Sequence, residues 1–263
     1  PLGVLWYGDG ADHGFYKSKD YGVGVKPQVV AGRLFAYQIF SRTLHAVDVY
    51  TGRLLWKTDV EHFTRYASMD DGIYVAGGDR CRVLDPATGE VSKTFPYQVR
   101  EGATPQVSDV RVGADVIVIA AAAEKVRSIE KGLWDSNVLV ALDRETGEQL
   151  WTREAQDRFN NHAFAVARGT VFAIDSVSPA QEAADARRGS QSSPETATIL
   201  ALDARTGQEK WRAATTNPFR QYSADGWLGL RGNDDWLAFA ERSGLLLTGR
   251  QNEVHAFDGA TGK

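Results

Sequence analysis

The chain has 263 residues, enough for one or two domains, and a net charge of −4 from 30 Lys+Arg against 34 Asp+Glu. This balance argues against a nucleic-acid-binding surface, which needs a basic excess. No stretch approaches the roughly 18 consecutive apolar residues of a membrane span. The single cysteine, Cys81, excludes an internal disulfide, a cysteine-based zinc site and an iron–sulfur cluster.

Short apolar segments with a central turn signal recur along the chain and predict β-hairpins. In chain order they are residues 29–36, 70–75, 112–118, 166–172 and 241–247. Each of them precedes a second hairpin, which is built on a repeated turn motif.

The repeated motif is Asp-x-x-Thr-Gly, preceded by an apolar strand. In the first copy Gly52 lies four residues after Asp48, and Trp56 lies four residues after Gly52. The Asp side chain can accept hydrogen bonds from backbone N–H groups ahead of it, and Gly tolerates a positive φ. The motif residues are Asp48, Gly52, Trp56, Asp85, Gly89, Asp143, Gly147, Trp151, Asp203, Gly207, Trp211, Asp258 and Gly262. In the second copy Lys93 stands where a Trp is expected.

Two hairpins in each repeat make a four-stranded antiparallel sheet, and such sheets repeated around an axis form a β-propeller. We therefore predict an all-β propeller, with the Trp residues packed between blades and the Asp residues capping turns. Five blades are visible in the sequence. They are expected at residues 27–60, 64–97, 106–155, 161–214 and 235–263.

The ends of the chain leave two interpretations open. The fifth copy stops at Lys263, before a Trp-bearing strand, while residues 1–9 contain Val4-Leu5-Trp6, which resembles such a strand. Either residues 1–9 close a five-bladed ring, or the chain is the first part of a ring of seven or eight blades. We favour a domain truncated at the C-terminus, because a natural chain seldom ends inside its own turn motif.

The pattern Ala-x-Asp-x-x-Thr-Gly-x-x-x-Trp resembles the tryptophan-docking motif of propellers with the pyrroloquinoline quinone (PQQ) repeat. Residues 1–6, Pro-Leu-Gly-Val-Leu-Trp, followed by residues 27–35, Pro-Gln-Val-Val-Ala-Gly-Arg-Leu-Phe, also resemble a bacterial, planctomycete-type group of such proteins. The resemblance implies eight blades more often than five, and a periplasmic or extracellular location. The superfamily contains PQQ-dependent alcohol and glucose dehydrogenases. It also contains non-catalytic relatives, such as an outer-membrane assembly scaffold lipoprotein, so the fold does not decide the function.

A PQQ dehydrogenase needs Ca²⁺ on oxygen ligands and a carboxylate that accepts the substrate proton. Alcohol-type members also carry adjacent cysteines, and Cys81 has no cysteine neighbour. No motif matches a quinone site residue by residue. We therefore predict a non-catalytic binding or scaffold module, with no catalytic residue, metal or cofactor, that binds a protein partner or small ligand. The alternative is a PQQ- and Ca²⁺-dependent oxidoreductase whose site is completed by further blades.

Candidate ligand-binding residues come from loops that lead into inner strands, which line one mouth of a propeller channel. These loops are residues 8–26, 61–66 and 158–162. Their polar residues are Asp12, His13, Arg65, Asn160, Asn161 and His162. An anionic or sugar-like ligand or a partner peptide would suit this rim, and loop 8–26 alone suggests a glycan or peptide binder. His45 and His255 share one repeat position, and we expect both on the surface.

Overall fold

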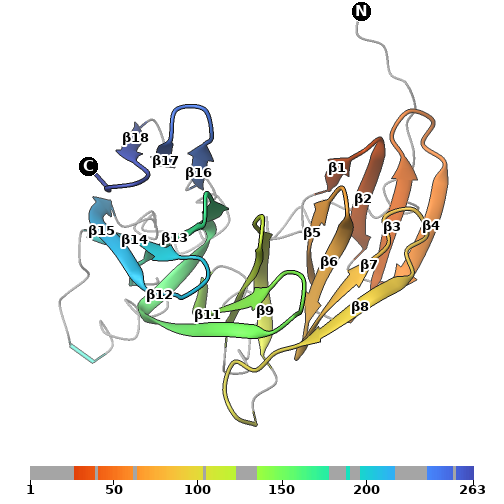
Figure 1. The fold of residues 1–263 in the computed structure, drawn as a ribbon, viewed down its shortest axis with the longest axis horizontal. Helices are drawn as coiled ribbons and strands as arrows, with labels where there is room; N and C mark the ends of the chain where they lie inside the picture. The colour runs from red at the N-terminus through yellow and green to blue at the C-terminus, as the bar shows by residue number, and fades with distance from the viewer. Residues whose placement is uncertain are drawn as a thin grey trace, which may run out of the picture.

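The sheets of the computed structural model follow one another along an open arc (Figure 1). The structure describes residues 27–38, 41–61, 64–102, 105–122, 135–177, 188–189, 196–216, 236–250 and 253–263. Every regular element within these ranges is a β-strand, and neighbouring strands pair antiparallel. This confirms the all-β class. Residues 1–26 lie outside the described residues, so the closing strand at residues 1–9 stays a prediction.

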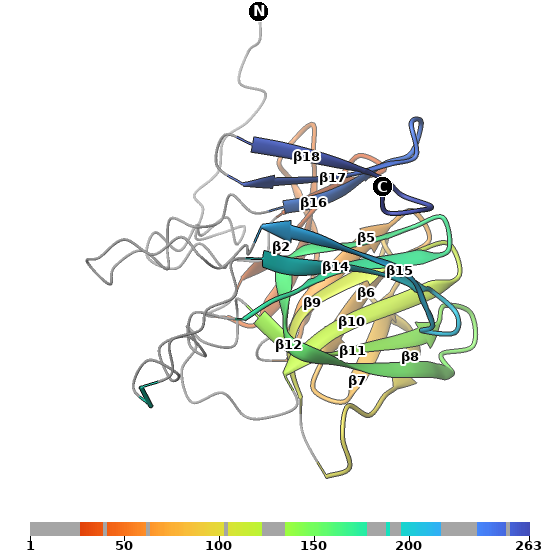
Figure 2. The ribbon, with the colours of Figure 1, turned by 90° about the vertical axis from the view of Figure 1, so that its left-hand side faces the viewer.

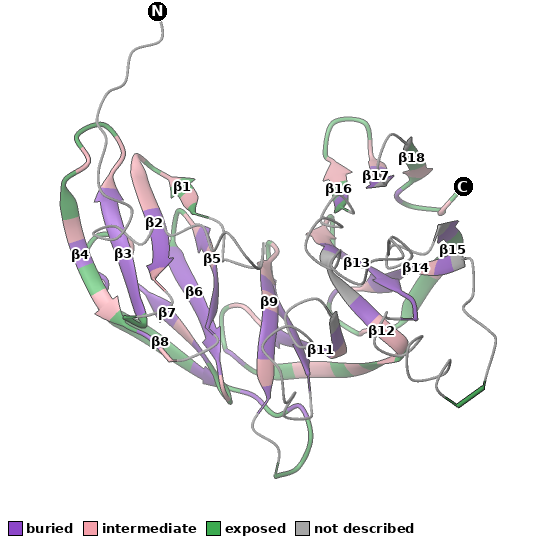
Figure 3. Ribbon diagram, turned by 180° about the vertical axis from the view of Figure 1, so that it is seen from behind, coloured by how far each residue is buried: buried purple, intermediate pink, exposed green. Residues whose placement is uncertain are grey.

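The first two sheets each contain four strands in chain order. Blade 1 consists of β1 (Gln28–Val30), β2 (Arg33–Gln38), β3 (Thr43–Asp48) and β4 (Leu54–Asp59). Blade 2 consists of β5 (Arg65–Met69), β6 (Gly72–Gly77), β7 (Arg80–Leu84) and β8 (Val91–Pro96). In Figure 3 the strands inside these sheets are largely buried, and the edge strands β4 and β8 are largely exposed.

Blades 3 and 4 share a strand and form one seven-stranded sheet. Its strands are β9 (Gln106–Val112), β10 (Val116–Ala122), β11 (Asp135–Asp143), β12 (Gln149–Ala167), β13 (Thr170–Asp175), β14 (Thr196–Asp203) and β15 (Glu209–Thr216). The first part of β12 pairs with β11 and its second part with β13, with an irregular register between Phe159 and Phe164. Such an irregularity bends a strand, so one strand can serve two blades. The division at residues 155–161 stays a prediction.

Blade 5 contains three strands: β16 (Trp236–Ala240), β17 (Leu245–Arg250) and β18 (Glu253–Asp258). It stacks beside β14 and β15 (Figure 2). We call β1, β5, β9, the second part of β12 and β16 the inner strands, because these contact one another from blade to blade.

The repeated turns have one geometry. In the first copy the Asp48 carboxylate accepts hydrogen bonds from Thr51 N at 2.7 Å and the Thr51 hydroxyl at 2.8 Å, while Gly52 N donates to Asp48 O at 2.9 Å. The other four copies repeat the bond from the Thr backbone. The five motif glycines have φ between +69° and +75°, a region where a side chain costs about 1–2 kcal/mol.

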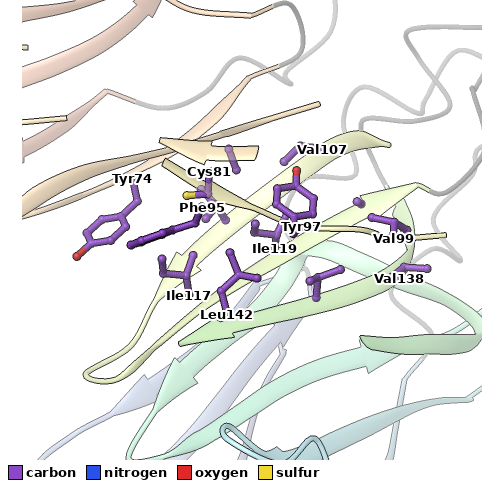
Figure 4. Packing of buried hydrophobic residues seen from close by; sticks show 14 of the residues in the cluster. Tyr74, Cys81, Phe95, Tyr97, Val99, Val107, Ile117, Ile119, Val138 and Leu142 are labelled. Atoms are coloured by element: carbon purple, nitrogen blue, oxygen red, sulfur yellow. The ribbon is translucent and has the colours of Figure 1, made fainter. Parts of the chain in front are cut away.

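The apolar core lies between neighbouring blades rather than within one sheet. Between blades 2 and 3, Phe95 and Tyr97 pack against Ile117, Ile119 and Leu142 (Figure 4). Three similar clusters join the other blades. Burial of apolar area therefore stabilises each blade through its neighbours.

One surface prediction is wrong. His45 is only 5% exposed, and its Nε2 lies 2.9 Å from the Thr43 hydroxyl. His255, at the same repeat position, is exposed as expected. The difference follows from the sheets, because β3 lies between β2 and β4, whereas β18 is an edge strand.

Candidate functional site

The repeat Trp residues join each outer strand to the turn of the next blade. Their Nε1–H groups donate to carbonyl oxygens one residue after a repeat Asp. The pairs are Trp56 to Pro86 O at 3.0 Å, Trp151 to Ala204 O at 2.9 Å and Trp211 to Gly259 O at 3.1 Å. Each indole also lies against the motif Gly of that turn, at Gly89, Gly207 and Gly262, where a Cβ would approach within 2.8 Å of the ring.

The junction between blades 2 and 3 uses other residues. Lys93 Nζ donates to Glu145 O at 3.3 Å, and the Phe95 ring covers Gly147. Arg144 adds an ion pair to Asp71 at 2.6 Å. The motif residues thus all lie at blade junctions and in turns.

The inner strands carry a second set of contacts between blades. Gln28 Nε2 donates to Tyr66 O at 2.9 Å, and Gln28 Oε1 accepts from Ser68 N at 2.7 Å. Further along, Arg111 Nε donates to Phe164 O at 3.4 Å, with its guanidinium 6.0 Å from the Phe164 ring centre. Side chains of inner strands therefore tie blade 1 to blade 2 and blade 3 to blade 4.

Arg65 makes the corresponding contact from blade 2 to blade 3. Its Nε donates to Ser108 O at 2.9 Å, and its Nη1 donates to Thr64 O at 3.1 Å. Arg65 is only 8% exposed, and burial lowers the pKa of its guanidinium, while the Asp109 charge acts in the opposite direction. Within the described residues both hydrogen-bond acceptors of Arg65 are backbone carbonyl oxygens, and neither is a carboxylate.

Asp109 is the carboxylate whose charge acts on Arg65, but its ion pair is with Arg111. Arg111 Nη2 lies 2.8 Å from Asp109 Oδ2, and Arg111 Nη1 lies 2.9 Å from Oδ1. Burial raises the pKa of Asp109, while Arg111 counteracts the rise. The Tyr37 hydroxyl is buried without a hydrogen-bond partner in the described part of the chain, and burial raises its pKa, with the Arg65 charge opposing this. The charge of Arg65 thus acts on both Asp109 and Tyr37, Arg42 also acts on Tyr37, and we call Arg65, Asp109, Arg111 and Tyr37 the cluster around Arg65.

The structure describes one of the six predicted rim side chains. Arg65 begins the inner strand β5. Asp12 and His13 lie outside the described residues, and Asn160, Asn161 and His162 fall within β12, where the structure describes only the backbone. Whether the six residues share a rim therefore stays a prediction.

Sequence reasoning missed the polar residues of the inner strands themselves. These residues are Gln28, Asp109 and Arg111, and each of them is next to a Val in its strand. A charged pair two residues apart in an apolar strand, as in Asp109-Val110-Arg111, is the signal that could have found them, because both side chains then point to one face.

Comparisons with known proteins support the fold assignment. Residues 134–218 match a family described as "Outer membrane protein assembly factor BamB", a PQQ repeat family. Quinohemoprotein alcohol dehydrogenase from Comamonas testosteroni is 19% identical, with a TM-score of 0.59 over 93% of this chain and 42% of that one. Quinohemoprotein alcohol dehydrogenase ADHIIG from Pseudomonas putida HK5 is 19% identical, with a TM-score of 0.58 over 92% of this chain and 41% of that one.

A europium-containing methanol dehydrogenase is 13% identical, with a TM-score of 0.56 over 90% of this chain and 49% of that one. No curated protein matches the chain. The fold is thus that of a PQQ-repeat β-propeller, as the motif resemblance predicts. The chain spans less than half the length of these three structures. Within the described residues, no helix has the length and apolar character needed to cross a membrane.

Proposed function

We propose that the chain is a non-catalytic binding module of a periplasmic or extracellular PQQ-repeat propeller, with its ligand site at the inner-strand cluster around Arg65. The supporting observation is the buried Arg65 guanidinium, whose hydrogen bonds to the described residues use two of its five N–H donors. The five repeat carboxylates support the non-catalytic assignment, because they accept backbone hydrogen bonds in turns. We assign the Trp contacts to the family's tryptophan-docking arrangement.

The charge of the cluster favours an anionic ligand. A cation removed from water is unfavourable unless it is paired and hydrogen-bonded. Among the described residues Asp109 pairs with Arg111 and no carboxylate forms a direct ion pair with Arg65, so one positive charge of the cluster is uncompensated there. A ligand carboxylate or phosphate beside Arg65 would restore that balance, and the Tyr37 hydroxyl would be available to donate to it.

Calorimetric titration tests this assignment. The probes are inorganic phosphate, succinate, PQQ and, as an uncharged sugar, glucose. We expect one or more of the anions to bind and glucose not to bind, and Arg65→Gln to weaken the binding at least tenfold. Lys93→Gln, which removes an exposed cation at a blade junction, is the matched control. Arg65→Lys retains the charge if Arg65→Gln does not fold. Equal affinity of the Arg65 variants and the wild type would refute the site.

A second candidate is a PQQ- and Ca²⁺-dependent oxidoreductase, favoured by the dehydrogenase structures that the chain resembles. Arg65 would suit a carboxylate of PQQ. For Ca²⁺ the fit is lacking, because the described residues contain no group of three or more His, Cys, Asp or Glu that could hold a metal ion. We therefore derive no catalytic step. Dye reduction with added PQQ and Ca²⁺, over an alcohol and sugar panel, tests this candidate, and turnover would replace the binding-module assignment.

A further inference from the structure

One carboxylate of the inner strands stands next in the chain to the Arg65 contact. Asp109 follows Ser108, whose carbonyl oxygen accepts a hydrogen bond from Arg65 Nε at 2.9 Å. The register of β9 against β10 shifts between Ala120 and Ala121, at the level of Ser108. Such a shift changes the direction of the groups beside it. The irregular part of β9 therefore supplies both the carbonyl that holds Arg65 and the carboxylate that follows it.

Arg65 and Asp109 interact through their charges, yet no ion pair joins them. Burial raises the pKa of Asp109, and the charges of Arg111 and Arg65 both oppose this rise. A carboxylate and a guanidinium that are both removed from water attract each other more strongly than they would at the surface. A direct pair of Asp109 with Arg65 would use the N–H donors that an external anion needs.

Arg111 holds the Asp109 carboxylate in another position. Its Nη2 lies 2.8 Å from Asp109 Oδ2, and its Nη1 donates to Oδ1 at 2.9 Å, so one guanidinium spans both carboxylate oxygens. The Val110 N–H also donates to Oδ1, at 2.8 Å. The Asp109 side chain is 16% exposed, so this pair replaces most of the water that a free carboxylate would bind.

Arg111 is itself fixed from blade 4. Its Nε donates to Phe164 O at 3.4 Å, its guanidinium lies 6.0 Å from the Phe164 ring centre, and its Nη1 donates to Val110 O at 3.3 Å. A side chain that is already ordered by such contacts loses less conformational entropy when it binds a carboxylate. One side chain therefore serves both the contact between blades 3 and 4 and the pairing of Asp109.

We propose that Arg111 is a positioning residue of the anion site: it binds Asp109 and thereby keeps the donors of Arg65 open to an external anion. This inference rests on the function proposed above. Without Arg111, the Asp109 carboxylate turns to Arg65 and acts as an intramolecular competitor, at an effective concentration on the order of millimolar. The chain thus carries a competitor of its own ligand, and Arg111 holds that competitor away from the site.

Calorimetric titration of the full chain with succinate and with inorganic phosphate tests this role. For an anion that the wild type binds, we expect Arg111→Gln to weaken binding at least tenfold. Asp109→Asn in the same background removes the competitor and should restore the affinity to within threefold of the wild type. Arg144→Gln is the matched control, because Arg144 also joins blades 2 and 3 through a carboxylate, that of Asp71 at 2.6 Å, and it should leave the affinity unchanged.

Arg111→Lys separates positioning from a simple effect of charge. It retains the positive charge, but an ammonium group cannot span both Asp109 oxygens as a guanidinium does. We therefore expect Arg111→Lys to weaken anion binding at least threefold, whereas an effect of charge alone would leave the affinity unchanged. The same variant serves if Arg111→Gln does not fold, which circular dichroism shows.

A double-mutant cycle in urea tests the exchange of partners without any ligand. The cycle combines Arg65→Gln with Asp109→Asn, first in the wild type and then in the Arg111→Gln background. In the second background Asp109 pairs with Arg65. The non-additive part of the shift in urea midpoint should therefore be at least twice as large there as in the wild type.

Failure of the anion site and failure of this inference give different results. If neither anion binds the wild type, the function proposed above fails, and the urea cycle still decides the role of Arg111. If an anion binds through Arg65 but the Arg111 variants bind it as the wild type does, the inference is overturned and the site stands. An equal coupling of Arg65 and Asp109 in the two backgrounds would also overturn the inference.

Discussion

Replacing Gly207 by Ala should reveal how strongly the Trp151 indole is coupled to the turn of the next blade. Gly207 has φ +69°, and a Cβ there would lie 2.8 Å from two atoms of the indole ring. The backbone conformation alone costs a residue with a Cβ about 1–2 kcal/mol. Forcing an extra methyl group into a packed contact costs a further ~1–3 kcal/mol. We therefore expect Gly207→Ala to lower the free energy of unfolding by about 2–5 kcal/mol.

A double-mutant cycle separates the two contributions. Trp151→Ala removes the ring, so in that background Gly207→Ala should cost only the ~1–2 kcal/mol of the backbone conformation. Gly169→Ala is the matched control, because Gly169 has φ +65° and a Cβ there would meet nothing within 4 Å. Urea unfolding of the four proteins of the cycle and the control gives the values. The reasoning fails if Gly207→Ala costs the same in both backgrounds, or if it costs no more than Gly169→Ala.

Three further outcomes are expected. Phe95→Ala should lower the free energy of unfolding by ~3–5 kcal/mol, because Phe95 is 6% exposed and covers Gly147. Lys93→Ala should change it by less than ~0.5 kcal/mol, so equal urea midpoints of the two variants would contradict this prediction. Hydrogen bonds from Thr146 N and then Arg205 hold the pKa of Asp143 below its usual value, so its stabilisation is present above about pH 4 and is lost as the pH falls through the lowered pKa. The urea midpoint of Asp143→Asn should therefore fall less between pH 6 and pH 3 than that of the wild type. An equal fall in both proteins would argue against this role of Asp143. Burial raises the pKa of the Cys81 thiol to about 12, so a thiol reagent at pH 8 should label the chain only after unfolding, and rapid labelling of the folded chain would be inconsistent with this.

The turns could be predicted from the sequence because their signal is local. Asp, Thr and Gly within five residues are sufficient to form the hydrogen bonds seen at Asp48. Contacts between blades join residues far apart in the sequence, so the replacement of Trp by Phe95 and the role of Gln28 emerge only from the fold. The continuous strand β12 was missed for a similar reason, because its register change depends on two neighbouring strands.

The candidate site was predicted in part. Arg65 follows from topology, since it stands at the start of an inner strand, but its burial and its partner Ser108 do not. The pairing of Asp109 with Arg111 was not expected, because alternating charged residues in a strand are usually found on a solvated face.

Two sets of contacts at the blade junctions, from the repeat Trp residues and from polar side chains of the inner strands, run in one direction. Trp56, Trp151 and Trp211 each reach forward to a later turn, and Gln28, Arg65 and Arg111 reach forward to a later inner strand. The arc is therefore a head-to-tail polymer with chemically different ends, like a filament built through heterologous interfaces. Duplication of the gene segment for one blade would lengthen such a polymer without requiring a new kind of interface, which gives evolution a direct way to vary the number of blades.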